Sequence, residues 1–146
     1  MVVILREIVK MQDVVEALIT HLKTVSAVTT LVSTRIWGGD IQRAEITSMP
    51  RKNIVITESG GPEEFRTHTV QRQRVDIYSY GESYYQAGRV DRAVADALMA
   101  IRRTTANSTL IHSVGYSGRI SLKIPESGWE YYMRSAMIYV GETAVA

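Results

Sequence analysis

The chain has no cysteine, and this absence excludes three kinds of site. Without a thiol there is no disulfide, no thiolate zinc site and no cysteine nucleophile. Long apolar runs are missing too, because the stretch Met1 to Leu5 is soon interrupted by Arg6, Glu7 and Lys10 and is too short to cross a membrane. It lacks a basic region before it and a small-residue cleavage site after it. We therefore expect neither a secretory signal nor a membrane partner.

A large excess of charge of one sign is also absent. Seventeen Lys and Arg residues against 15 Asp and Glu residues give a net charge of only +2. A protein that grips nucleic acid through many phosphates usually shows a larger or more clustered excess. Tyrosine pairs beside basic residues could stack on bases, so a nucleic-acid surface stays open as an alternative. A subunit interface is favoured, because tyrosine buries area there while keeping a polar tip. The residues concerned are Arg51-Lys52, Arg72, Arg74, Tyr84-Tyr85, Arg102-Arg103 and Tyr131-Tyr132.

The motifs of common catalytic sites are missing as well. His21, His68 and His112 are far apart and lack the H-E-x-x-H spacing of a metalloprotease. No G-x-S-x-G, G-x-x-x-x-G-K or G-x-G-x-x-G occurs, so neither a nucleophile elbow nor a phosphate-binding loop is indicated. The adjacent Glu63 and Glu64 are better interpreted as a solvated loop than as an acid and base pair. We expect no enzymatic activity, no catalytic residues, no metal and no cofactor.

The clearest structural signal lies between Val70 and Arg103. Alternation places Val75 and Ile77 on one face of a strand, with the polar residues from Arg74 to Tyr80 on the other. After Gly81, the spacing of Ser83 and Gln86 is that of a helix capping box. The following helix carries one apolar stripe, and basic residues are expected in its last turn. The stripe is Val90, Val94, Ala97, Leu98 and Ile101; Arg102 and Arg103 follow, and Asn107 is the expected stop.

The rest of the chain shows weaker patterns. Helical spacing predicts a helix over residues 4–23, although residues 1–10 could form a strand or an arm, and residues 26–33 fit a short helix or an irregular turn. Turns are predicted at 38–40, 115–118 and 125–128, and a surface connection over 41–52. Strands are predicted at 53–57, 110–114, 119–124 and 129–140. A mobile loop is expected at 59–68 and a frayed tail at 141–146.

Together these elements predict one domain over residues 1–146. Its expected class is α+β: a mostly antiparallel sheet of about five strands, with one long helix packed across it and an N-terminal helix.

The last predicted strand suggests where an interface lies. Tyr131, Met133, Met137 and Tyr139 fall on one of its faces, while the other face is also apolar. A strand with apolar residues on both faces needs two covers, and a neighbouring subunit can supply the second. The candidate subunit or tube interface comprises Glu63, Glu64, Phe65, Arg72, Arg74, Tyr131, Met133, Met137 and Tyr139.

Several blocks, taken in order, resemble the tail-terminator, or tail-completion, proteins of long-tailed bacteriophages. They are Leu31-Val-Ser-Thr-Arg-Ile36, Met49-Pro-Arg-Lys-Asn-Ile-Val-Ile56 with Ser59-Gly-Gly, Val75-Asp-Ile-Tyr-Ser-Tyr80, the helix through Val90, Ala93, Val94 and Leu98, and the closing strand over 129–140. Each block alone is mainly a fold pattern, so their order and spacing carry the resemblance, which covers roughly Val14 to Val140.

The resemblance implies a structural role in a virion. Proteins of this family form a ring, usually of six subunits, on the head-proximal end of the tail tube, where they stop tube polymerisation and join the tail to the head. The implied partners are further copies of the chain, the tail-tube protein and a head-side connector protein. DNA would pass through the lumen without sequence-specific binding. Another head–tail connector or a tail-tube component, and more remotely a small nucleic-acid-binding domain or an undetected hydrolase, remain alternatives.

Overall fold

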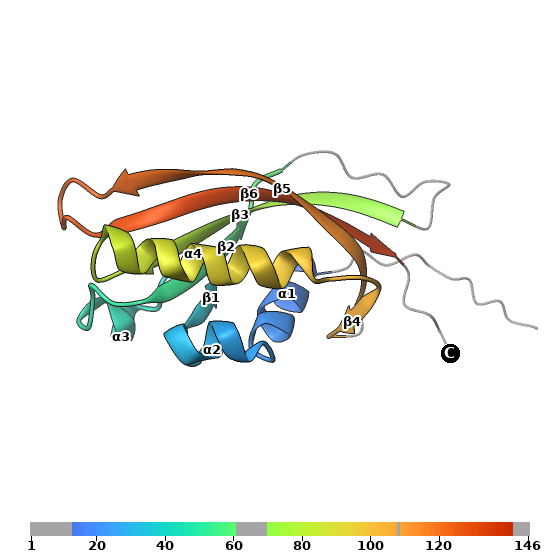
Figure 1. Cartoon of the computed structure of the whole chain (residues 1–146), viewed down its shortest axis with the longest axis horizontal. Coiled ribbons are helices and arrows are strands. Elements are labelled where there is room, and N and C mark those ends of the chain that lie inside the picture. Colours follow the sequence, from blue (N-terminus) through green and yellow to red (C-terminus); the bar gives the residue numbers. More distant parts are fainter. Residues whose placement is uncertain (1–12, 61–69, 108, 142–146) are drawn as a thin grey trace, which may run out of the picture.

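A computed structural model describes residues 13–60, 70–107 and 109–141. In chain order its elements are α1 (Val14–Leu22), α2 (Ser26–Val32), β1 (Ile36–Gly38), α3 (Arg43–Ile46), β2 (Asn53–Glu58), β3 (Val70–Gly81), α4 (Tyr84–Met99), β4 (Thr104–Ala106), β5 (Thr109–Lys123) and β6 (Glu130–Gly141). The strands form one sheet in the order β1-β2-β3-β6-β5-β4. The β1–β2 pair is parallel and the other four pairs are antiparallel. The sheet curls over α4, α1 and α2, which lie on its concave side (Figure 1).

The predicted fold class is therefore wrong. The described residues form a mixed six-stranded sheet that curls into a half-barrel, accompanied by four helices, instead of about five antiparallel strands with one long helix across them. The two strands missing from the prediction, β1 and β4, have only three residues each, which is too short for alternation to be detected. Because β1 runs parallel to β2, the segment between them must cross from one end of the sheet to the other.

The predicted turn over residues 115–118 is also wrong. These residues lie inside the single long strand β5, which pairs with β6 along its length through two shifts in register. At the second shift, two residues, Ser117 and Gly118, stand opposite the single residue Ser135, which is the arrangement of a β-bulge. Glycine and serine at this point mark an irregularity within a strand, not its end.

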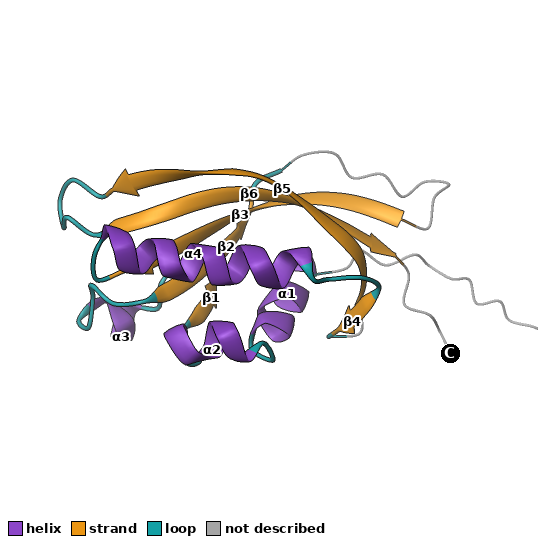
Figure 2. Cartoon of the chain, in the orientation of Figure 1, coloured by secondary structure: helices purple, strands orange, loops and turns teal. Residues whose placement is uncertain are grey.

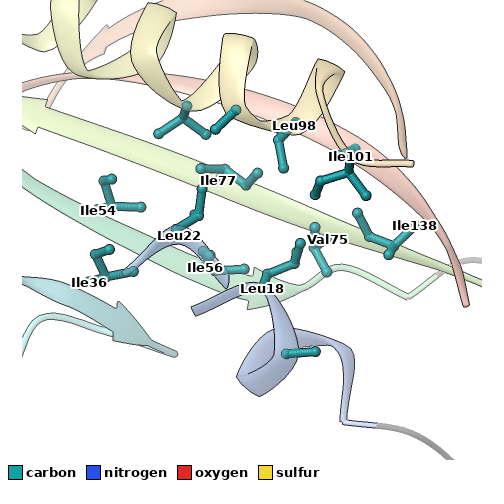
Figure 3. Close-up of a cluster of buried hydrophobic side chains, with 14 of the residues drawn as sticks. Leu18, Leu22, Ile36, Ile54, Ile56, Val75, Ile77, Leu98, Ile101 and Ile138 are labelled. Atoms are coloured by element: carbon teal, nitrogen blue, oxygen red, sulfur yellow. The ribbon is translucent and has the colours of Figure 1, made fainter. Parts of the chain in front are cut away.

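The strand–helix unit from β3 to α4 is confirmed. Val75 and Ile77 are buried on the inner face of β3, and Leu98 of α4 lies over them (Figure 3). Val90, Val94 and Ala97 of α4 are buried as well. The Ser83 hydroxyl accepts a hydrogen bond from the Gln86 backbone N–H at 3.4 Å, as the cap predicts. The helix ends at Met99, before the two arginines, yet the Arg102 guanidinium donates to the Met99 carbonyl at 2.7 Å.

Two short helices complete the core. Leu18 and Leu22 of α1 and Val28 and Val32 of α2 are buried, which confirms a helix in the second half of the predicted 4–23 segment and a short helix after it. No single described helix is long and apolar enough to cross a membrane, and α1 and α2 reach that length only as a pair bent by 88°. The first part of the predicted N-terminal helix lies outside the described residues, as does most of the expected loop at 59–68.

The connection over 41–52 is more than a surface loop, because hydrogen bonds anchor it to the sheet. Its helix α3 carries Glu45, which is only 8% exposed and receives a hydrogen bond from Arg51 Nη2 to Oε1 at 2.7 Å. Asn53 Nδ2 donates to the same carboxylate at 3.3 Å, and Asn53 Oδ1 accepts from Trp37 Nε1 at 2.8 Å. The Arg51 hydrogen bond holds the pKa of Glu45 below its ordinary value. This network ties the connection to the first two strands of the sheet.

Candidate assembly surface

The sheet has one face that the helices do not cover. Helices α1, α2 and α4 all lie on the inner, concave face (Figure 2). Residues directly opposite each other in an antiparallel pair point to the same face. Arg72 faces Tyr139 and Arg74 faces Met137 across the β3–β6 pair. We call the sheet surface that carries these residues, on the side away from α4, the outer face.

The outer face continues along both strands and onto β5. Across β3 and β6, Tyr78 faces Met133 and Tyr80 faces Tyr131. Across β6 and β5, Met133 and Tyr131 face Ile120 and Leu122, whose exposed fractions are 52% and 39%. Tyr131, Met133, Met137 and Tyr139 are half-buried in the single subunit. Aromatic residues and methionine are enriched at protein interfaces, so this composition favours contact with another protein.

A tyrosine cluster stiffens one end of the outer face. The ring of Tyr131 lies 5.1 Å from that of Tyr80 and 5.8 Å from that of Tyr78, measured between centroids. Burial, with smaller effects from Tyr131, Asp40 and Tyr78, raises the pKa of Tyr80 to about 12. Tyr80 therefore stays neutral at physiological pH. The cluster offers aromatic area with polar hydroxyl tips.

A shallow hollow of about 460 Å³ opens in the middle of the sheet. Small residues make it, among them Gly115 and Ser117 of β5 and Ser135 of β6, while Arg74 and Met137 form part of its wall. Arg74 Nε donates to Ser59 Oγ at 3.2 Å, which fixes the guanidinium at the rim. The hollow can receive a protruding side chain, whereas the ridge at Ile120 and Leu122 can supply one.

Six of the nine predicted interface residues thus come together on one face: Arg72, Arg74, Tyr131, Met133, Met137 and Tyr139. Glu63, Glu64 and Phe65 lie outside the described residues. The prediction omitted Tyr78, Tyr80, Ile120 and Leu122, although their strand alternation was visible in the sequence. What the sequence did not show was that β3, β6 and β5 lie side by side in this order, so that their outward residues form one surface.

The inner face holds a polar cluster that the sequence interpretation missed. Asp91 of α4 is fully buried and binds Arg134 of β6 through two contacts, Nε–Oδ1 at 3.1 Å and Nη2–Oδ2 at 2.7 Å. Arg119 Nη1 reaches the same carboxylate at 3.3 Å. Hydrogen bonding to Asp91 raises the pKa of Arg134 above its ordinary value. A signal was present, because alternation places Arg134 between the inward-facing Tyr132 and Ala136, where a buried cation requires a buried anion.

The histidines do not form a ligand set in the part of the chain that the structure describes. His21 lies in α1, where burial lowers its pKa, and His112 lies in β5 with its Nδ1 3.4 Å from Arg103 Nη1. His68 lies outside the described residues. Among residues 13–60, 70–107 and 109–141, no group of three or more His, Cys, Asp or Glu side chains is placed to hold a metal ion.

No protein-family model and no curated protein sequence matches this chain. Its fold, however, is similar to that of a solved chain from the virion of a native gene transfer agent particle, with a TM-score of 0.66. The two chains are 13% identical, and the match covers 87% of this chain and 93% of the other. At this identity the match establishes a shared fold. The predicted likeness to virion proteins is therefore confirmed at the level of the fold: this chain has the fold of a chain found in a virion.

Proposed function

We propose that this chain is a structural protein of a phage-like virion, and that it forms a ring on the head-proximal end of the tail tube. The observation that carries the proposal is the fold shared with a virion chain over nearly the full length of both proteins. The ordered sequence resemblance to tail-terminator proteins supplies the position in the particle. In this role the ring stops tube polymerisation and joins the tail to the head.

The outer face supports assembly as the activity of the protein. A head-to-tail ring needs two different complementary patches on each subunit. The outer face, which carries a ridge of exposed apolar residues and a hollow lined by small residues, can supply one of these two patches. Each contact can be weak, because a closed ring engages every subunit twice and gains avidity. Arg72 and Arg74 then set the register of the contact more than its strength, since rim charges chiefly steer and orient.

The remaining parts of the proposal follow from the role in a ring. We propose that the protein turns over no substrate and needs no cofactor. Its partners are copies of itself, the tail-tube protein and a head-side connector protein. DNA passes through the lumen without sequence-specific binding, which suits a net charge of +2, because tight phosphate contacts would hold the DNA in place.

The test is genetic and visual. In a phage that lacks this protein, we expect tails without a defined upper end, many overlong tubes and no joined heads in electron micrographs. The purified protein, or the protein bound to tubes, should appear as closed rings. Tails of normal length that still attach to heads would exclude the terminator role and favour another head–tail connector or a tube component. An absence from virions would exclude both.

A further inference from the structure

A pocket of about 470 Å³ lies on the opposite side of the molecule from the outer face, beside the first half of α4. We call it the arginine pocket, and we define it by Tyr84, Tyr85, Arg89, Arg92, Arg119 and Tyr132. The first four come from α4, Arg119 comes from β5 and Tyr132 from β6. Tyr85, Arg89 and Arg92 recur at intervals of four and three residues, so they form a helix stripe separate from the apolar one.

Arg119 is positioned in the pocket by contacts with Tyr132, Asp91 and Gly88. Its guanidinium carbon lies 4.4 Å above the centre of the Tyr132 ring. Its Nη1 lies 3.3 Å from Asp91 Oδ2 and 3.5 Å from the Gly88 carbonyl oxygen. A side-chain carbon at Gly88 would lie 3.4 Å from the Tyr132 ring and 3.6 Å from this Nη1, so position 88 borders both groups closely. The Nε and Nη2 groups of Arg119 make no hydrogen bond to the described residues and remain available as a fork of donors.

The pocket keeps a net positive charge. The carboxylate of Asp91 is shared between Arg134 and Arg119, so its one negative charge cannot neutralise both guanidinium groups. Arg89 and Arg92 form no ion pair with any residue that the structure describes. Three arginines therefore line a pocket of about 470 Å³, which has room for one or two side chains.

Aromatic rings form the rest of the pocket. The Tyr84 ring lies 5.4 Å from Tyr132 and 5.3 Å from Tyr85, whose side chain is 76% exposed. Tyrosine and arginine side by side, with the rings exposed, are the residue types that dominate binding energy in protein interfaces. We propose that the arginine pocket binds carboxylate side chains of an acidic peptide segment on another protein chain.

A peptide fits the charge distribution better than nucleic acid does. Nucleic-acid binding needs cations spread along a groove that follows several phosphates. Here three arginines line one pocket, whereas Arg51 and Arg134 are bound to Glu45 and Asp91. Several arginines around one pocket match one or two carboxylates, which planar arginine forks bind in pairs of hydrogen bonds.

The test uses the whole chain labelled with ¹⁵N and two small probes, acetyl-Glu-Glu-amide and the neutral acetyl-Gln-Gln-amide. We expect the acidic probe to shift the NMR signals of the Gly88 amide and the Arg119 Nε group. These shifts should reach saturation at a probe concentration of about 10 mM or lower. The neutral probe should leave these signals unchanged. Equal shifts with both probes, or no shift at Gly88 and Arg119 with the acidic one, would overturn the proposal.

Variants locate the binding within the pocket. Replacing Arg89 and Arg92 together by Gln should weaken binding of the acidic probe by about 10-fold, since loss of each exposed charged contact weakens binding by a factor of about three. The matched control replaces Arg43 and Arg103, two exposed arginines elsewhere, by Gln and removes the same charge without an effect on binding. Tyr85→Ala gives a second measurement, because the exposed ring can be removed without disturbing the core.

An oligothymidine single strand serves as the competing probe. If it shifts the pocket signals at lower concentration than the acidic probe does, at equal ionic strength, the site binds nucleic acid and the peptide proposal is wrong. None of these measurements depends on ring formation, so the peptide-binding proposal and the ring proposal can be rejected independently of each other.

Discussion

Gly81 is the last residue of β3, just before the turn into α4, and there is no room for a side chain at this position. A Cβ atom at this position would lie 2.2 Å from the backbone nitrogen of Ala87 and 2.7 Å from its Cα. We expect Gly81→Ala to lower the free energy of unfolding by about 1–3 kcal/mol or more, because backbone must move to relieve the overlap. Urea denaturation measures the loss. Gly115→Ala is the control, since nothing lies within 4 Å of the point that a Cβ atom would occupy there, and no such loss is expected.

Glu45 should make stability depend on pH. The hydrogen bond from Arg51 lowers its folded pKa below the ordinary value of 4.5, so the unfolded chain binds this proton more tightly than the folded chain does. The stabilisation is therefore present above pH 4.5 and is lost as the pH falls through the folded pKa. Thermal unfolding between neutral and acid pH should show a steeper fall for the natural chain than for Glu45→Gln. The exposed Glu126→Gln should keep the steep fall, and a parallel profile for Glu45→Gln would contradict the prediction.

At the scale of elements, α4 is fastened to the sheet by a buried ion pair as well as by its apolar stripe. Asp91→Ala leaves Arg134, a buried cation, without its partner and should cost about 3–5 kcal/mol. Adding Arg134→Met removes the orphaned charge and should recover part of that loss, so the two changes are not additive. A double-mutant cycle in urea measures the coupling. Purely additive losses would show that the pair contributes nothing specific to the packing of α4.

The elements that sequence patterns predicted correctly are those whose signal is local. The apolar stripe of α4 and the alternation of Val75 and Ile77 repeat over many residues, and each repeat reinforces the last. The three-residue strands β1 and β4 offer no repeat. Their place in the sheet depends on partners distant in sequence, which is why the fold class was wrong.

The difference between local patterns and distant pairing also explains which surface residues the sequence predicted and which it did not. Arg72, Arg74 and the outward residues of β6 were identified from each strand separately. Ile120 and Leu122 extend the same face because β5 pairs with β6 and carries a bulge. The glycine and serine of this bulge led to the wrong prediction of a turn. The pairing of Asp91 with Arg134, 43 residues apart, depends on how α4 lies across the sheet.

At the scale of the molecule, the two faces of the sheet are built differently. The inner face is sealed by helices, whereas the outer face exposes methionine, tyrosine and aliphatic side chains. We expect Met133→Glu to abolish rings in electron micrographs, because it places a charge at the centre of the contact, while the thermal stability of the subunit changes little. Met99→Glu is the matched control: Met99 is 53% exposed at the end of α4, away from the outer face. Rings that persist in Met133→Glu would show that assembly uses another surface.

The bulge at Ser117 and Gly118 has a consequence for how these surfaces can vary. Every residue beyond it, up to the hairpin at Pro125, has its side of the sheet decided by that one extra residue. With the bulge, Arg119 points inward and Ile120 and Leu122 point outward. If the same chain paired here without the bulge, Gly118 would stand opposite Arg134 and the parity of the whole segment would reverse, bringing two aliphatic side chains beneath α4 and turning the arginine out to solvent. The apolar ridge on one side and the arginine pocket on the other therefore both depend on this single bulge, and its loss at unchanged chain length would exchange the two sets of side chains together.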